Sequence, residues 1–260
     1  MYTRNILKLK DKYHLLFRKA AAFIFSVFLV MSCTKEKEVF NVNGAGKDSI
    51  ISDAAHQIDT VKKTYLALGD SYTIGASVAA GESFPEQLTS LLKNDHINIA
   101  SPDIIAVSGW TTADLLNSLQ TNSPLKDYSF VTLLIGVNNQ YQGRQIDEYK
   151  VQFSELLNLA ISYTGGKSTH VFVLSIPDYG VTPFGSQFEK DEIARQIDLF
   201  NAANKVIAEK AGATYVDITA ISRDAEYEPS LIARDGLHPS PEQYYKWMQK
   251  LHPLVLEILQ

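Results

Sequence analysis

The chain has 260 residues, of which 45% are hydrophobic, and its formal net charge is −5 at neutral pH. This acidic balance argues against nucleic acid as a partner, because nucleic-acid-binding domains usually present basic surfaces. The single cysteine, Cys33, excludes an intramolecular disulfide and a cysteine-based metal cluster.

The first 32 residues are predicted to be an export signal. Basic residues are scattered over positions 4–19, and the stretch 20–31 is apolar except for Ser26. This apolar stretch is shorter than the roughly 20 residues of a transmembrane helix, but it suits the core of a secretory signal peptide. It ends in the sequence Leu29-Val30-Met31-Ser32-Cys33, which resembles a bacterial lipobox, although Met31 is an unusual residue for its position.

The lipobox resemblance implies that Cys33 becomes the acylated first residue of the mature protein. Its acyl chains would anchor the protein to a membrane of the bacterial cell envelope, facing the periplasm or the cell surface. The alternative is a free cysteine at the end of an ordinary signal or anchor. Residues 33–62 are then the lipidated cysteine and a polar tether. The charged stretch 35–38 in it is interpreted as a solvated linker or as a sorting signal for surface display.

Residues 63–260 are predicted to form one folded domain of ordinary size. Apolar runs rich in β-branched residues, typical of strands buried on both faces, lie at 64–68, 104–107, 130–135, 171–176 and 214–218. Helical periodicity separates them, most clearly at 146–161 and 193–207. Strands that alternate with helices predict an α/β fold, a three-layer α/β/α sandwich around a parallel sheet of about five strands.

Four segments carry helix-boundary signals. Capping-box patterns begin at Ser83 and Thr111, and Ser240 precedes a proline that suits the first helical position. Gly212 is predicted to end the helix that precedes it. Pro253 is expected to kink the last helix.

Several residues that could take part in catalysis follow the ends of the predicted strands or precede the last helix. Ser71 follows the first strand, Gly109 the second and Asn138 the third, while Asp235 and His238 lie before the last helix. Active sites of parallel α/β sheets form at the carboxyl ends of the strands. The sequence therefore predicts a site at this edge of the sheet.

These residues are of the types that serine hydrolysis requires. A serine hydroxyl needs a base to remove its proton, and a carboxylate must orient that base. His238 is the best candidate among the histidines, because Asp235 lies three residues before it. Read alone, His238 would more often be structural.

Ester cleavage also requires hydrogen-bond donors to the oxyanion. The backbone N–H groups of Ser71 and Gly109 and the side-chain amide of Asn138 could supply them. The alternatives are that Gly109 permits a sharp turn and that Asn138 caps a loop.

The order of these segments resembles that of the four sequence blocks of the GDSL or SGNH hydrolases. The blocks here are Gly69-Asp70-Ser71, Gly109, Gly136-Val137-Asn138 and Asp235-x-x-His238. The resemblance implies a flavodoxin-like α/β/α fold without metal or organic cofactor. It also implies Ser71 as nucleophile, His238 as base, Asp235 as its orienting acid, and Gly109 and Asn138 in the oxyanion hole. Asp70 is expected to stabilise its turn.

The chain departs from the family pattern at two positions. Tyr72 replaces the usual leucine after the serine, and Asn139 replaces the usual aspartate. Neither change removes a reacting atom, but Asn139 could alter how the Asn138 loop is held.

The expected activity is that of an exported, lipid-anchored esterase. Its substrate would be an acetylated carbohydrate, a lysophospholipid or another short acyl ester. The alternative is a catalytically silent lipoprotein that binds carbohydrate or lipid on the same scaffold. Candidate pocket residues, which could equally be packing or solvated residues, are Tyr72, Trp110, Tyr141, Arg144 and Tyr179.

Overall fold

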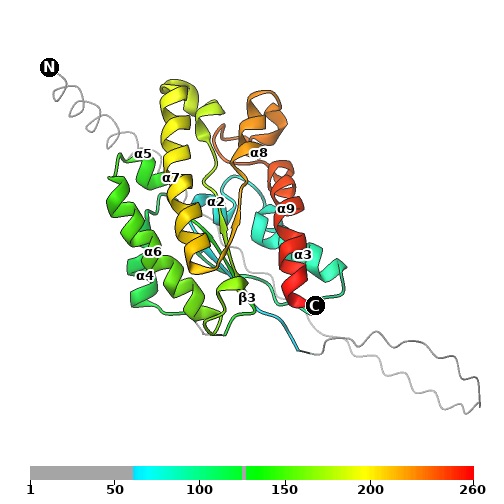
Figure 1. The fold of residues 1–260 in the computed structure, drawn as a ribbon. Helices are drawn as coiled ribbons and strands as arrows, with labels where there is room; N and C mark the ends of the chain where they lie inside the picture. The colour runs from blue at the N-terminus through cyan, green and yellow to red at the C-terminus, as the bar shows by residue number, and fades with distance from the viewer. Residues whose placement is uncertain (1–60, 125–126) are drawn as a thin grey trace, which may run out of the picture. The chain divides into compact units, whose positions relative to one another are not determined.

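The computed structural model describes residues 61–124 and 127–260 (Figure 1). The predicted signal peptide over 1–32, Cys33 and nearly all of the tether lie outside the described residues. Among the helices that are described, none is both long and apolar enough to cross a membrane.

One five-stranded sheet forms the centre of the domain, and its strand order is β2-β1-β3-β4-β5. All neighbouring strands are parallel, and Leu68 of β1 pairs with Ile105 of β2 and with Leu133 of β3. The strands are β1 (Tyr65–Gly69), β2 (Asp103–Ala106), β3 (Phe130–Leu134), β4 (Val171–Leu174) and β5 (Thr214–Val216). These bounds lie within two residues of the predicted runs, which confirms the parallel sheet.

The expectation that every strand is buried on both faces is wrong for the two edge strands. The central strands β1, β3 and β4 are fully buried. In β2, Asp103 is exposed and the other residues are half-buried, and in β5 only Val216 is fully buried. The strand order explains this difference, because β2 and β5 each have a neighbour on one side only.

Helices cover both faces of the sheet. Figure 1 shows α4, α6 and α7 on one face and α3 and α9 on the other. The helices are α2 (Ser71–Ile74), α3 (Phe84–Asn94), α4 (Thr112–Thr121), α5 (Val137–Tyr141), α6 (Ile146–Tyr163), α7 (Lys190–Ala211), α8 (Thr219–Arg223) and α9 (Pro241–Leu259). Single 3₁₀ turns lie at Ala80–Glu82, Ser168–His170, Tyr179–Val181, Gly185–Gln187, Asp224–Glu226 and Pro229–Leu231. The predicted three-layer α/β/α sandwich is confirmed.

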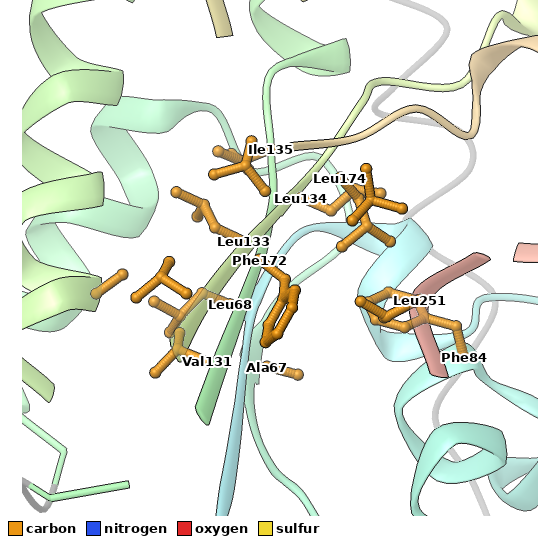
Figure 2. Packing of buried hydrophobic residues seen from close by; sticks show 14 of the residues in the cluster. Ala67, Leu68, Phe84, Val131, Leu133, Leu134, Ile135, Phe172, Leu174 and Leu251 are labelled. Atoms are coloured by element: carbon orange, nitrogen blue, oxygen red, sulfur yellow. The ribbon is translucent and has the colours of Figure 1, made fainter. Parts of the chain in front are cut away.

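The core lies on both sides of the sheet, as Figure 2 shows. Leu133 and Ile135 point to one face, and Leu134 points to the opposite face, where Phe84 and Leu251 approach from α3 and α9. All five side chains are at most 1% exposed. Burying a side chain of this size contributes roughly 1.5–3 kcal/mol, so this packing holds the strand ends in place.

The capping predictions fare differently at different helices. Thr111 and Asp114 form the expected reciprocal capping box at the start of α4. Ser240 Oγ accepts from the N–H of Gln243, and Gly212 ends α7 with φ +77°. The prediction of a capping box at Ser83 is wrong, because the buried Ser83 hydroxyl donates to Ala80 O at 3.4 Å instead of capping α3. Helix α9 continues through Pro253 to Leu259.

Candidate active site

Ser71 is the first residue of the short helix α2, directly after β1 and Asp70. Glycine at position 69 lets this helix fold back tightly against the sheet. A Cβ atom on Gly69 would lie 2.1 Å from Thr73 Oγ1 and 2.4 Å from Leu134 O, closer than real contacts allow. Ser71 therefore sits at the carboxyl edge of the sheet, held by β1 below it.

Asp70 caps α2 from a fully buried position. Its Oδ1 accepts from the N–H of Tyr72 at 3.0 Å, and its Oδ2 has no hydrogen-bond partner among the described residues. Burial raises the pKa of Asp70 to about 7, although the hydrogen bond from Tyr72 opposes the rise. Asp70 thus stabilises the turn, as expected.

Asp235 and His238 form a close pair in the loop before α9. His238 Nδ1 donates to Asp235 Oδ2 at 2.5 Å, and the N–H groups of Leu237 and His238 both donate to Asp235 Oδ1 at 3.0 Å. Because Nδ1 is occupied by the carboxylate, Nε2 is the ring nitrogen left to accept a proton. The predicted pairing of these two residues is therefore present in the structure.

The pKa of Asp235 is shifted in the opposite direction to that of Asp70, because Asp235 accepts several hydrogen bonds. Partial burial on its own would raise the pKa of Asp235. The hydrogen bonds from His238, from Ser77 and from the loop's own backbone outweigh this effect and hold the pKa well below its ordinary value. Asp235 is therefore ionised throughout the neutral range.

Two contacts bring the Asp235 loop against the segment that carries Ser71. The rings of Tyr72 and His238 meet edge to face with centroids 5.5 Å apart, and Ser77 Oγ donates to Asp235 Oδ2 at 2.6 Å. In the described part of the chain, Ser71 and His238 themselves share no hydrogen bond.

Asn138 contacts the residue that follows Gly109, in the turn after β2. Gly109 has φ +86°, a left-handed conformation that glycine adopts without steric cost, in the turn closed by Trp110 N–H and Val107 O. Asn138 Nδ2 donates one hydrogen to Trp110 O at 2.9 Å. This bond fixes the orientation of the amide, and the second hydrogen of Nδ2 stays available for another acceptor.

Asn139 anchors the Asn138 loop to the start of α4. Its Oδ1 accepts from the N–H of Thr112 at 3.0 Å, and its Nδ2 donates to Thr112 Oγ1 at 2.7 Å. Thr112 Oγ1 in turn donates to Gln152 Oε1 at 2.5 Å. Asparagine therefore holds this loop with hydrogen bonds of its own, at the position where the GDSL pattern that the sequence resembles usually has aspartate.

The candidate pocket residues fall into three groups. Tyr72 and Tyr179 are buried, and Tyr72 O also accepts a hydrogen bond from the hydroxyl of Tyr244. Trp110 and Tyr141 are half-buried. Arg144 is exposed and donates to Gln142 Oε1 at 3.5 Å. That any of them contacts substrate stays a prediction.

Several residues near the site were not anticipated from the sequence. Ser77 contacts Asp235, and no pattern marked it, since the two are far apart in the chain. Phe184 and Phe188 pack with Tyr141 and Tyr179 in one aromatic cluster. The N–H of Phe184 also donates to Gly236 O at 2.9 Å, which joins the loop after β4 to the Asp235 loop.

Comparison with known proteins identifies a sequence family that covers most of the folded domain. Residues 67–246 match the sequence model of the GDSL-like Lipase/Acylhydrolase family. No curated protein matches the chain.

Solved structures with the same fold share little sequence with the chain. The protein TesA superposes with a TM-score of 0.59 at 16% identity, covering 75% of this chain and 99% of its own. Axe2, an acetylxylan esterase from Geobacillus stearothermophilus, gives 0.58 at 20% identity, covering 76% and 94%. The esterase EstA from Pseudoalteromonas sp. gives 0.56 at 17% identity, covering 75% and 97%.

Proposed function

The chain belongs to the GDSL-like lipase/acylhydrolase family and is a serine ester hydrolase, and we propose that it cleaves carboxylic esters through an acyl-enzyme on Ser71. The observation that carries this proposal is the 2.5 Å hydrogen bond between His238 Nδ1 and Asp235 Oδ2. It supplies an oriented base in the loop that packs against the helix of Ser71.

In the proposed first step, Ser71 Oγ attacks the ester carbonyl carbon while His238 Nε2 accepts the hydroxyl proton. The N–H groups of Ser71 and Gly109 and Nδ2 of Asn138 donate to the oxyanion. The C–O bond to the alcohol then breaks, and the departing alkoxide takes the proton from Nε2. The ionised Asp235 stabilises the imidazolium between these two transfers.

Water completes the cycle by the same route. It attacks the acyl carbonyl while Nε2 accepts its proton, and collapse of the second tetrahedral intermediate returns that proton to Ser71 Oγ. The carboxylic acid leaves and the serine is regenerated.

The proposed substrates are acetylated carbohydrates, lysophospholipids or other short acyl esters. Axe2 acts on acetylxylan, and the aromatic side chains of Trp110 and Tyr141 near the site could face the sugar or acyl part of such an ester. Export and lipid anchoring through Cys33 are part of the same proposal. They rest on the basic start, the apolar stretch 20–31 and the cysteine that follows it.

Hydrolysis of p-nitrophenyl acetate by the purified protein tests the proposal. Ser71→Ala should lower kcat at least about 10³-fold, because alanine cannot form the acyl-enzyme. Thr73→Ser, a change on the same short helix that keeps a hydroxyl, serves as the control and should leave kcat close to wild type. Equal release of nitrophenol by wild type and Ser71→Ala would contradict the mechanism and favour a silent binding protein.

A further inference from the structure

Among residues 61–124 and 127–260, one residue outside the Asp235 loop donates a hydrogen bond to the Asp235 carboxylate. Ser77 Oγ donates to Oδ2 at 2.6 Å across 158 positions of sequence. The other donors recorded for Asp235 are His238 Nδ1 and the N–H groups of Leu237 and His238, all within four residues of chain. Ser77 therefore ties the carboxylate to the loop that follows the helix of Ser71.

Ser77 reaches Asp235 from a strained backbone conformation. Its φ is +68°, in the left-handed region that costs a non-glycine residue roughly 1–2 kcal/mol. Backbone hydrogen bonds on either side hold it there, from Ala76 N–H to Ser71 O and from Val78 N–H to Gly75 O. Strain of this kind concentrates at functional sites, where the surrounding structure enforces it.

The hydroxyl of Ser77 distinguishes this residue from a glycine that only forms the turn. Glycine would remove the strain at this position, as it does at Gly75 with φ +73°. Serine adds only a hydroxyl, and that hydroxyl donates to Asp235.

We propose that Ser77 is a positioning residue for the hydrolysis, acting through Asp235 on His238. The inference rests on the proposed function, in which Asp235 orients the base. The backbone N–H groups hold Oδ1, and Ser77 holds Oδ2 beside Nδ1 of His238. Bonds to both oxygens fix the plane of the carboxylate.

Fixing the carboxylate is needed because Asp235 is not enclosed. Its side chain is 31% exposed, so water competes for the same lone pairs. A hydrogen bond to an ionised group is stronger than one between neutral groups and resists this competition. Ser77 thus keeps Oδ2 directed at Nδ1 while His238 gains and loses a proton.

Two substitutions of Ser77 separate positioning from folding. Ser77→Gly removes the hydroxyl and relieves the strain, so its urea midpoint should equal or exceed that of wild type. Its kcat for p-nitrophenyl acetate should fall about tenfold, which is the effect of losing one hydrogen bond to a charged group, while KM stays within about twofold. Ser77→Ala keeps the strain and should lose the same factor in kcat.

The matched control is His96→Gly. His96 is also left-handed, with φ +64°, and it is exposed in the turn after α3. This substitution relieves the same kind of strain outside the catalytic machinery, so kcat should not change.

Wild-type kcat in Ser77→Gly would overturn the inference. A fall in kcat that is matched by a fall in the urea midpoint would also overturn it, because Ser77 would then serve only the fold. The Ser71→Ala variant, measured in parallel, tests the proposed function separately. If Ser71→Ala is inactive and Ser77→Gly is normal, only the role of Ser77 fails; if Ser71→Ala is active, the proposed function itself fails.

Discussion

Asp70 and Asp235 are two acids with opposite environments in one site. Asp70 is fully buried and accepts a single hydrogen bond from the described residues, and burial raises its pKa to about 7. Asp235 is partly exposed and accepts four hydrogen bonds within the described part of the chain, which hold its pKa low. Asp235 can therefore support a positive charge on His238, whereas Asp70 makes the fold sensitive to pH.

The raised pKa of Asp70 predicts a pH-dependent loss of stability. The unfolded chain releases this proton near pH 3.8 and the folded chain near pH 7. The folded state therefore binds the proton more tightly, and stability falls as pH rises between these values and levels off above pH 7. Asp70→Asn keeps the acceptor for the Tyr72 N–H and removes the titration. Its advantage over wild type in unfolding free energy should be about 2–4 kcal/mol larger at pH 8 than at pH 4.

Urea denaturation at both pH values measures this difference. Asp147→Asn provides the control, since the Asp147 side chain is 89% exposed. Its replacement should change the unfolding free energy by the same amount at both pH values. An Asp70→Asn advantage that is the same at pH 4 and pH 8 would contradict the account.

The sequence identifies some residues of the candidate site but not others. Ser71, Asp235 and His238 could be found because their chemistry and order are distinctive, and the structure places the last two in contact. Ser77 could not be found, because its contact depends on a left-handed backbone angle and on a partner 158 positions away. Asn139 stands out in the sequence as a departure from the family pattern, but only its two hydrogen bonds to Thr112 show how it holds the loop.

At the scale of elements, an ion pair to the buried carboxylate of Asp178 helps to hold the loop after β4. Arg223 Nε, at the end of α8, donates to Asp178 Oδ2 at 2.9 Å, and the Asp178 side chain is only 2% exposed. Arg223 Nη2 also donates to Asp198 of α7 at 2.7 Å. The same loop reaches the Asp235 loop through Phe184 N–H and Gly236 O. Arg223 therefore supports a loop that contacts the Asp235 loop.

Arg223→Ala should destabilise the protein by about 2 kcal/mol, because it leaves the Asp178 carboxylate buried without its cation. The change can be measured as the shift in unfolding free energy in urea. Arg195→Ala is the control, since Arg195 pairs with Glu192 on the exposed surface of α7 and such pairs contribute about 0–1 kcal/mol. Equal losses of unfolding free energy in the two variants would contradict this prediction, because the pair with Asp178 would then contribute no more than an exposed pair.

The elements themselves were predictable where the local pattern decides the structure. Continuous apolar runs marked all five strands, and Thr111-x-x-Asp114 marked the start of α4. Ser83 carries the same kind of pattern, yet its buried hydroxyl donates to Ala80 O. The difference in burial between central and edge strands depends on the strand order, which the apolar runs do not contain.

At the scale of the whole molecule, the strand order explains where the site forms. In the order β2-β1-β3-β4-β5, β2 lies on one side of β1 and the later strands lie on the other side. The boundary between β1 and β3 is therefore the topological switch point, where open parallel sheets bind ligands. Ser71 follows β1 and Asn138 follows β3. Residues far apart in the sequence thus come to the same edge of the sheet.

The proposed lipid anchor predicts where the whole protein partitions. In cells that process lipoproteins, the wild-type chain should enter the detergent phase on phase separation, because two or more acyl chains hold a protein firmly in a membrane. Cys33→Ala should remain in the aqueous phase or stay unprocessed. Ser32→Ala keeps a small residue before the cysteine and should behave as wild type. Processed Cys33→Ala in the detergent phase would contradict acylation at Cys33.

The central claim is that Ser71 is the nucleophile, and covalent labelling measures it most directly. Treatment with an organophosphate ester of p-nitrophenol, followed by mass spectrometry of the digested protein, should give one adduct per chain, on the peptide that contains Ser71. His238→Ala should remain largely unlabelled, because the serine then lacks its base. An adduct on a different residue, or an unlabelled wild type that still hydrolyses p-nitrophenyl acetate, would contradict the account.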